Sequence, residues 1–200
     1  MAVRHQIPYK SGIFFITITC ARWLPLFEKY NLHSVVYEWF DYLKNSGHYI
    51  NAFVIMPNHF HAIISFTHTD KSINKIVGDG KRFMTYSILK KLKELGENTQ
   101  LEALKSFVNK TDATRNKKHE VFEPSFDWKL LESDKFMEQK LDYIHNNPIR
   151  SKVVLTDDPI DYKHSSARQY FDGTYYLYQV TELYEMKVVN LTMRKYGLEE

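Results

Sequence analysis

The pattern of hydrophobic and polar positions predicts a strand followed by an amphipathic helix near the start of the chain. Apolar and hydroxyl-bearing residues alternate over residues 13–20, directly after Gly12, and a period of two is typical of a half-buried strand. Gly47 stands where it can end the following helix in a left-handed conformation. That helix is predicted from a spacing of three and four residues between apolar positions, namely Leu32, Val35, Val36, Trp39, Phe40 and Leu43.

The rest of the pattern predicts a hairpin and then a mixture of helices and strands. Residues 49–56 and 60–67 are two β-rich runs joined through Pro57-Asn58. The later elements are, in order, a helix from Met84 to Leu95 after a flexible Gly78-Asp79-Gly80 segment, a short helix opened by a capping box at Thr99–Glu102, a polar loop over 109–119, a strand within 119–126, a helix from Ser133 or Asp134 that stops before Pro148, and a small helix near 165–171. This order favours an α+β fold, a ferredoxin-like antiparallel sheet with packed helices.

Composition limits the classes to which the protein can belong but does not indicate a binding partner. The 200 residues hold 44% hydrophobic residues and 27 Lys and Arg against 24 Asp and Glu, which suits a single globular domain over 1–200 and excludes a disordered chain. Apolar runs stay far below the ~20 residues of a membrane-spanning helix, and the start of the chain lacks the apolar core of a secretory signal. Cys20 has no second cysteine to pair with. We therefore expect a cytoplasmic protein that does not engage a membrane.

Charge is unevenly distributed along the chain. Residues 71–118 hold twelve Lys and Arg against five Asp and Glu, a balance of +7, whereas the remainder holds fifteen against nineteen, a balance of −4. A basic section beside a near-neutral body favours a polyanionic partner. A solvated helical face would explain the same charges.

Two histidines open the second strand of the predicted hairpin. His59 and His61 project from one face if residues 59–61 are extended, while Phe60 points to the opposite face. Two imidazoles on one face can bind one metal ion. Two ordinary polar residues on an exposed face would give the same pattern.

A tyrosine and an asparagine stand one helical turn apart near the end of the predicted late helix. Tyr143 lies roughly 130° from the centre of the apolar stripe formed by Met137, Leu141 and Ile144, and Asn147 follows on the side of Tyr143. A phenol is a nucleophile and an amide oxygen is a hard ligand, so the pair can serve one site. Taken alone, one tyrosine among fourteen is usually a packing residue.

Together these two motifs resemble a known family. The phrase Val54-Ile55-Met56-Pro57-Asn58-His59-Phe60-His61 and the later phrase Tyr143-Ile144-His145-Asn146-Asn147-Pro148 are similar to the paired motifs of the single-tyrosine HUH transposases of small insertion sequences, in particular the REP-associated tyrosine transposases. The resemblance runs from about residue 8 to residue 172. Residues 90–118 look like a basic insertion relative to compact family members, and residues 174–200 match nothing in the family, so they form an extension of unknown role.

The resemblance implies the HUH endonuclease/transposase fold and a DNA strand transferase. It makes Tyr143 the nucleophile, His59 and His61 metal ligands, and Asn147 the third ligand, ahead of His145. Mixed imidazole and amide-oxygen ligands suit Mg²⁺ or Mn²⁺, which we expect as the cofactor, and imidazole also suits Zn²⁺. The resemblance implies a covalent 5′-phosphotyrosine intermediate and single-stranded or hairpin DNA as substrate. Some relatives work as dimers and others as monomers, which leaves a homodimer open.

Candidate DNA contacts come from the basic section and from the neighbourhood of the tyrosine. Each is equally explained by surface charge or packing. They are Lys81, Arg82, Lys90, Lys91, Arg150 and Lys152 for phosphates, and Trp128, in a predicted loop over 126–128, for stacking on unpaired bases.

Two other functions fit the same features. A non-catalytic nucleic-acid hairpin-binding protein on the same fold would need the basic section alone. A metal-dependent phosphodiesterase that uses water would need the histidines but not Tyr143. The joint presence of Tyr143 and Asn147 favours the transposase.

Overall fold

A four-stranded antiparallel sheet forms the centre of the protein. The computed structural model describes residues 6–68, 70–114, 116–152 and 154–186. The strands are β1 (Gly12–Thr19), β2 (Tyr49–Ile55), β3 (His59–Phe66) and β4 (Asp127–Leu130), in the spatial order β2-β3-β1-β4. Every neighbouring pair is antiparallel. This order, with a helix after β1 and another after β3, is the ferredoxin-like topology, so the predicted α+β fold is confirmed.

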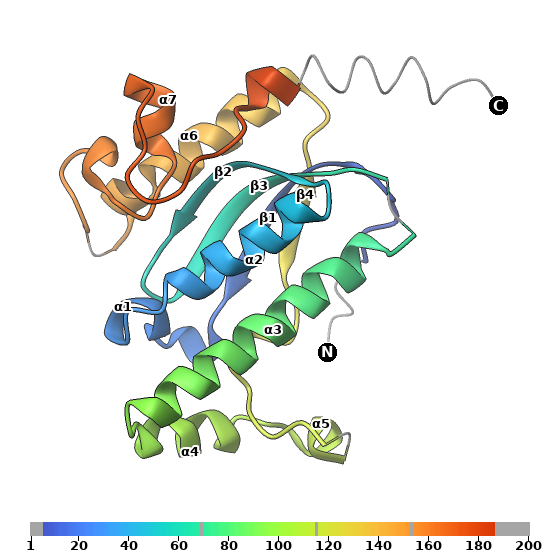
Figure 1. Ribbon diagram of the computed structural model, residues 1–200, viewed down its shortest axis with the longest axis vertical. Coiled ribbons are helices and arrows are strands. Elements are labelled where there is room, and N and C mark those ends of the chain that lie inside the picture. Colours follow the sequence, from blue (N-terminus) through green and yellow to red (C-terminus); the bar gives the residue numbers. More distant parts are fainter. Residues whose placement is uncertain (1–5, 69, 115, 153, 187–200) are drawn as a thin grey trace.

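Helices cover both faces of this sheet (Figure 1). They are α1 (Leu26–Lys29), α2 (Ser34–Asn45), α3 (Ile73–Glu94), α4 (Asn98–Ser106), α5 (Lys110–Thr114), α6 (Asp134–Arg150) and α7 (Ala167–Asp172), with short 3-10 turns η1 (Ala21–Trp23) and η2 (Pro159–Asp161). In Figure 1, α2 and α3 lie in front of the sheet and α6 lies farther back.

The alternation along β1 and β3 sorts the core into two layers. Phe14, Ile16 and Phe60 point to one face, where they pack with Trp39 and Phe40 of α2. Phe15 and Ile63 point to the other face, where they pack with Ile144 of α6. Because side chains alternate across a strand, the histidines at the start of β3 share the α6 face.

The segment around Gly78 and Gly80 is helical, which corrects the prediction of a flexible segment before the helix. Helix α3 begins at Ile73, capped by the Ser72 hydroxyl, which accepts a hydrogen bond from the Lys75 amide (3.3 Å). Gly80 is buried there against the indole ring of Trp39. The glycine thus provides room for a close helix contact, and its backbone is as regular as that of its neighbours.

Other local predictions were also wrong. Residues 109–119, predicted to be a polar loop, include helix α5 (Lys110–Thr114). Residues 119–126 contribute only an isolated bridge between Phe122 and Cys20, and the fourth strand begins at Asp127. Helix α6 continues beyond the predicted stop, through Pro148 in its last turn to Arg150. The capping box also fails, since Glu97, whose side chain makes no capping bond, precedes α4.

The extension at the C-terminal end is partly described, up to residue 186. Tyr178 packs against Tyr37, Phe40 and Phe53, and its hydroxyl donates a hydrogen bond to Asp41 (2.9 Å). Residues 187–200 lie outside the described part. Within the described part, no helix is long and apolar enough to cross a membrane.

Candidate active site

The two histidines lie side by side with two threonines on the α6 face of the sheet. The register of β1 and β3 pairs His61 with Thr17 and His59 with Thr19. His61 is buried, with 5% of its surface exposed, and its ring stacks on Phe15 at a centroid distance of 5.2 Å. The ring centroids of His59 and His61 are 4.8 Å apart. The predicted common face of the pair is therefore present.

Neighbouring polar groups orient both imidazoles through Nδ1. The Nδ1 of His59 lies 2.7 Å from the Asn58 side-chain oxygen, so this nitrogen carries the proton and donates. The Nδ1 of His61 lies 2.8 Å from the Thr17 hydroxyl. When Nδ1 donates to a fixed oxygen, Nε2 keeps its lone pair for another ligand. Asn58 and Thr17 thus orient the two rings, and an Nδ1 that donates would leave Nε2 as the nitrogen that could bind a metal ion.

Burial keeps both imidazoles neutral near pH 7. It lowers the pKa of His59 to about 4. The pKa of His61 lies well below its ordinary value, because of burial first and then the nearby His59 and Lys140. A neutral imidazole is the form that binds metal.

Tyr143 of α6 reaches the histidine pair from above the sheet. Its Oη lies 3.4 Å from Nε2 of His61, and its ring meets Phe15 and His61 edge-on at 5.8 and 5.1 Å. The adjacent Ile144 is fully buried in the core, and this anchors the helix. Tyr143 is 43% exposed and lines the cleft, so the residue is accessible from solvent as well as close to the histidines.

Asn147 lies on the same cleft, one turn after Tyr143. The cleft has a volume of about 1510 Å³ and is lined by His59, His61, Tyr143, Asn147 and Trp23 among others. His145 is buried, and its Nε2 lies 3.0 Å from the Ser166 hydroxyl, away from the cleft. The structure thus brings together the four residues predicted for chemistry and separates His145 from them.

The donor set fits a divalent metal ion only if an amide takes part. In the described ranges, no three His, Cys, Asp or Glu side chains gather in a way that could hold a metal ion. Besides the two imidazoles, the lining of the cleft includes the Asn147 amide, the Thr17 and Thr19 hydroxyls and the Glu123 and Asp127 carboxylates, and of these the Asn147 oxygen is the third donor that the resemblance implies. Such a mixed nitrogen and oxygen set suits Mg²⁺, Mn²⁺ or Zn²⁺ and leaves coordination positions for a substrate.

Trp23 is a feature of the cleft that the sequence did not indicate. It is 61% exposed and meets the His59 ring edge-on at 5.7 Å. Arg22 and Trp23 both have positive φ angles, 54° and 58°, which cost energy in residues other than glycine. Two hydrogen bonds hold this turn, from the Arg22 amide to Glu123 Oε1 (2.9 Å) and from the Asn58 side chain to the Trp23 carbonyl (3.2 Å). Because β patterns and helical spacing do not report φ angles, no signal in the sequence marked this tryptophan.

Lys140 is a second unpredicted residue of the cleft. Its ammonium lies 4.8 Å from the centroid of the Phe15 ring and 5.3 Å from that of Tyr143. It precedes Tyr143 by one helical turn, a spacing that places both side chains on one side of α6. A positive charge therefore stands beside the phenol.

The residues predicted to contact DNA fall into two groups. Arg150 lines the cleft and is paired with Asp142 at 2.9 Å, and Lys152 is exposed just beyond α6. Trp128 is in strand β4 and not in a loop, with its ring edge-on to Phe14 at 6.0 Å. The lysines and arginine of α3 lie away from this cleft: Arg82 pairs with Asp79 (3.3 Å), Lys91 pairs with Glu94 (3.8 Å), Lys81 binds backbone carbonyls, and Lys90 is exposed.

A ferredoxin-like sheet with a histidine pair on a central strand, faced by a tyrosine on a helix, is the arrangement that the two motifs implied. The structure is similar to that of a REP-associated tyrosine transposase bound to a REP hairpin, with a TM-score of 0.60 and 18% identity over 92% of this chain and 95% of that one. The resemblance seen in the motifs is thus confirmed at the level of the fold.

A more distant similarity is to a putative transposase from Deinococcus radiodurans R1, with a TM-score of 0.43 and 14% identity over 73% of this chain and 97% of that one. No protein-family model matches the chain. No curated protein matches it in sequence.

Proposed function

We propose that this protein is a transposase that cleaves and rejoins single-stranded DNA through Tyr143. The observation that carries the proposal is the approach of the Tyr143 hydroxyl to the paired histidines, 3.4 Å from Nε2 of His61, in an open cleft. A structural tyrosine would bury its hydroxyl or tie it to the protein interior. The Tyr143 hydroxyl lies beside a candidate metal site, on a residue that is 43% exposed.

His59, His61 and Asn147 would hold Mg²⁺ or Mn²⁺. When bound, a divalent ion supplies polarisation of the non-bridging phosphate oxygens and favours the phenolate form of a nearby tyrosine. The chain itself contributes neutral, oriented imidazoles through Asn58 and Thr17.

In this reaction the phosphorus atom exchanges its bond to the 3′ oxygen of DNA for a bond to the tyrosine oxygen. The phenolic proton leaves, Oη of Tyr143 bonds to phosphorus, the bond from phosphorus to the 3′ oxygen breaks, and that oxygen takes up a proton. The product is a 5′-phosphotyrosine linkage and a free 3′ hydroxyl. Because the phosphodiester energy is retained, a second 3′ hydroxyl can reverse the step and join strands without a nucleotide cofactor.

Two further residues of the cleft have roles in this proposal. Lys140 lies beside the Tyr143 ring, so its charge attracts the approaching phosphate. The exposed face of Trp23 at the rim next to His59 is a stacking surface for a base beside the cleaved bond. The REP hairpin in the similar transposase supports a DNA hairpin as the partner.

The test is the formation of a covalent adduct. The protein is incubated with a labelled library of single-stranded hairpin oligonucleotides and Mn²⁺, and the mixture is separated on a denaturing gel. We expect an adduct that disappears with chelator, with Tyr143→Phe and with His61→Ala, and persists with Tyr184→Phe, a control at an exposed tyrosine outside the cleft. A hairpin-binding protein would give salt-dependent binding without an adduct. A phosphodiesterase that uses water would turn over repeatedly and tolerate Tyr143→Phe.

A further inference from the structure

A second cavity lies outside the cleft, between α3 and the segment that returns from the insertion to β4. We call residues 116–126 the return segment and this cavity the basic groove. The basic groove has a volume of about 1040 Å³. Its walls include Arg82, Tyr86, Lys90 and Lys93 from α3, and Lys118 and His119 from the return segment.

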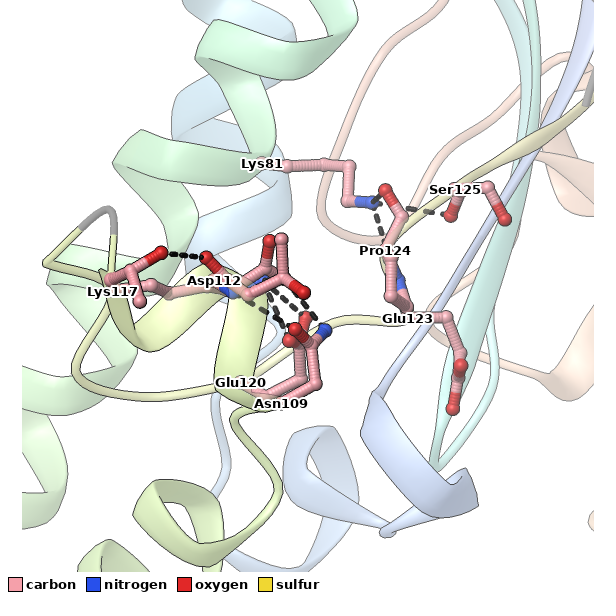
Figure 2. A network of polar contacts seen from close by, with 10 residues as sticks. Lys81, Asn109, Asp112, Lys117, Glu120, Glu123, Pro124 and Ser125 are labelled. Atoms are coloured by element: carbon pink, nitrogen blue, oxygen red, sulfur yellow. Dashed lines mark hydrogen bonds and ion pairs between the residues drawn. The ribbon is translucent and has the colours of Figure 1, made fainter. Parts of the chain in front are cut away.

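A network of polar contacts holds the return segment in place (Figure 2). The ammonium of Lys117 lies 2.6 Å from the Glu120 carboxylate and 3.6 Å from Asp112, and Asp112 also accepts a hydrogen bond from the Asn109 side chain (2.9 Å). Glu120 is buried, with 6% of its surface exposed, and its amide donates to the carbonyl of Leu104 (2.9 Å). These contacts join the return segment to α4 and α5 of the insertion.

Lys81 fastens the other end of the return segment. Figure 2 shows its ammonium reaching from α3 to the carbonyls of Glu123, Pro124 and Ser125, at 2.5, 3.3 and 3.1 Å. A charged donor that satisfies three carbonyls holds this turn in place. The basic groove is therefore built by specific contacts, and Lys81 is used in building it.

The pairing of the charged residues on its walls leaves the basic groove with a net positive charge. Of the acidic residues on its walls, Glu120 is neutralised by Lys117, Glu94 pairs with Lys91, and Glu123 binds the Arg22 amide. Among the described residues, no ion pair joins an acidic partner to Lys90, Lys93 or Lys118. These three lysines come from both walls.

The pKa of His119 reflects the positive charges that lie close to it. Its pKa is lowered by burial first and then by Lys93 and Lys105, with a smaller effect of Lys118. The Glu102 carboxylate opposes this effect in part. Positive charge thus dominates at the point where α3, α4 and the return segment meet.

The basic groove and the cleft share a wall. Glu123 and Phe126 line both cavities. A DNA strand that leaves the cleft across residues 123–126 therefore enters the basic groove directly.

We propose that the basic groove is a second DNA site, which binds the sugar-phosphate backbone of a single-stranded segment next to the strand that is cleaved. This inference rests on the proposed function for the identity of the polyanion. Lysines on two facing walls match the phosphates of one strand, and Tyr86, 60% exposed on α3, offers a ring for a base. Charged walls with an exposed aromatic ring are the combination that single-stranded nucleic acid binding uses.

The binding test compares two pairs of charge reversals. Lys93→Glu with Lys118→Glu changes the basic groove, and Lys10→Glu with Lys163→Glu is the control, because these lysines line neither cavity. The probe is a fluorescein-labelled oligo(dT) of about 30 nucleotides, with anisotropy measured over a range of salt concentrations. We expect the groove pair to weaken binding by about tenfold beyond the control pair and to lower the salt slope by about 1.4. Equal affinity and equal slope for the two pairs would overturn the proposal.

A cross-link supplies a second, independent measurement on the unmodified chain. An oligo(dT) of the same length with 5-iododeoxyuridine at scattered positions is irradiated, and the cross-linked peptides are mapped. We expect a cross-link at Tyr86, and cross-links confined to the cleft would overturn the proposal. If no adduct forms at Tyr143 while both groove results hold, the proposed function fails and the second DNA site stands. If the adduct forms while the groove results fail, the proposed function stands alone.

Discussion

Gly80 and Gly78 provide a matched pair of substitutions within one helix. Both lie in α3, two residues apart, in the segment whose two glycines indicated flexibility. A Cβ atom at Gly80 would lie 2.1 Å from Nε1 and 2.5 Å from Cε2 of the buried Trp39 ring, whereas a Cβ atom at Gly78 meets nothing within 4 Å. The same change, glycine to alanine, therefore has opposite consequences at the two positions.

The expected magnitudes follow from helix propensity and packing. Gly78→Ala removes backbone freedom from the unfolded chain and should raise the free energy of unfolding by about 0.5–1 kcal/mol. Gly80→Ala makes the same favourable contribution through helix propensity. It also overpacks the contact with Trp39, and overpacking lowers stability by about 1–3 kcal/mol when side chains can shift. Because Trp39 is wedged between α3 and the sheet with 3% exposure, we place the net loss for Gly80→Ala at about 1–2 kcal/mol.

Thermal unfolding followed by circular dichroism measures the difference. At about 2–4 °C per kcal/mol for a chain of this size, the melting temperatures of Gly78→Ala and Gly80→Ala should differ by about 6 °C, with the original protein between them. If both variants were equally stable, the contact between Gly80 and Trp39 would be refuted, and with it the continuous helix from Ile73 to Glu94.

Four further predictions concern the tyrosine helix, pH, the cleft and metal. Ser133→Ala removes the hydroxyl that caps the Phe136 amide (3.3 Å) and should lower the free energy of unfolding by about 1 kcal/mol in urea titrations; no change would argue against this cap. Burial lowers the pKa of His33 to about 4, so the unfolded chain binds more protons below pH 6.5. The contribution of His33 to the free energy of unfolding should therefore be fully present above that pH, and it should decrease by about 1–2 kcal/mol as the pH falls toward 5. A free energy of unfolding that does not change with pH in urea denaturation would contradict this. Trp23→Ala should weaken single-stranded DNA binding by about tenfold in anisotropy titrations while Trp23→Phe retains it; equal affinities would remove the stacking role. Chelator should abolish the adduct in the gel assay and leave DNA binding in place, whereas an adduct formed in excess chelator would exclude the metal role.

The sheet and the common face of the histidines follow from short-range patterns. Alternation over residues 13–20 marks β1, the β-rich run over 60–67 marks β3, and a period of two places His59 and His61 together. The approach of Tyr143 to His61 depends on how α6 packs on the sheet, which the helical stripe alone does not determine. Only the resemblance of the paired motifs connected residues so far apart in the chain.

Other parts of the site depend on tertiary contacts that leave no periodic pattern. Trp23 reaches the cleft through two positive φ angles fixed by Asn58 and Glu123. The charge of the basic groove depends on which lysines form ion pairs with carboxylates. Lys117 is neutralised by Glu120, and its neighbour Lys118 is not. The charge count of residues 71–118 predicted a polyanionic partner but did not separate lysines that build the groove from lysines that face it.

The central claim is that Tyr143 forms the covalent bond to DNA. The most direct measurement is peptide mapping by mass spectrometry of the adduct formed with Mn²⁺, after nuclease and protease digestion. We predict a phosphonucleotide on the peptide that contains Tyr143, joined through the 5′ phosphate, and free 3′ hydroxyls on the released DNA. A nucleotide on another residue, or cleaved DNA with free 5′ phosphates and no protein attached, would contradict it.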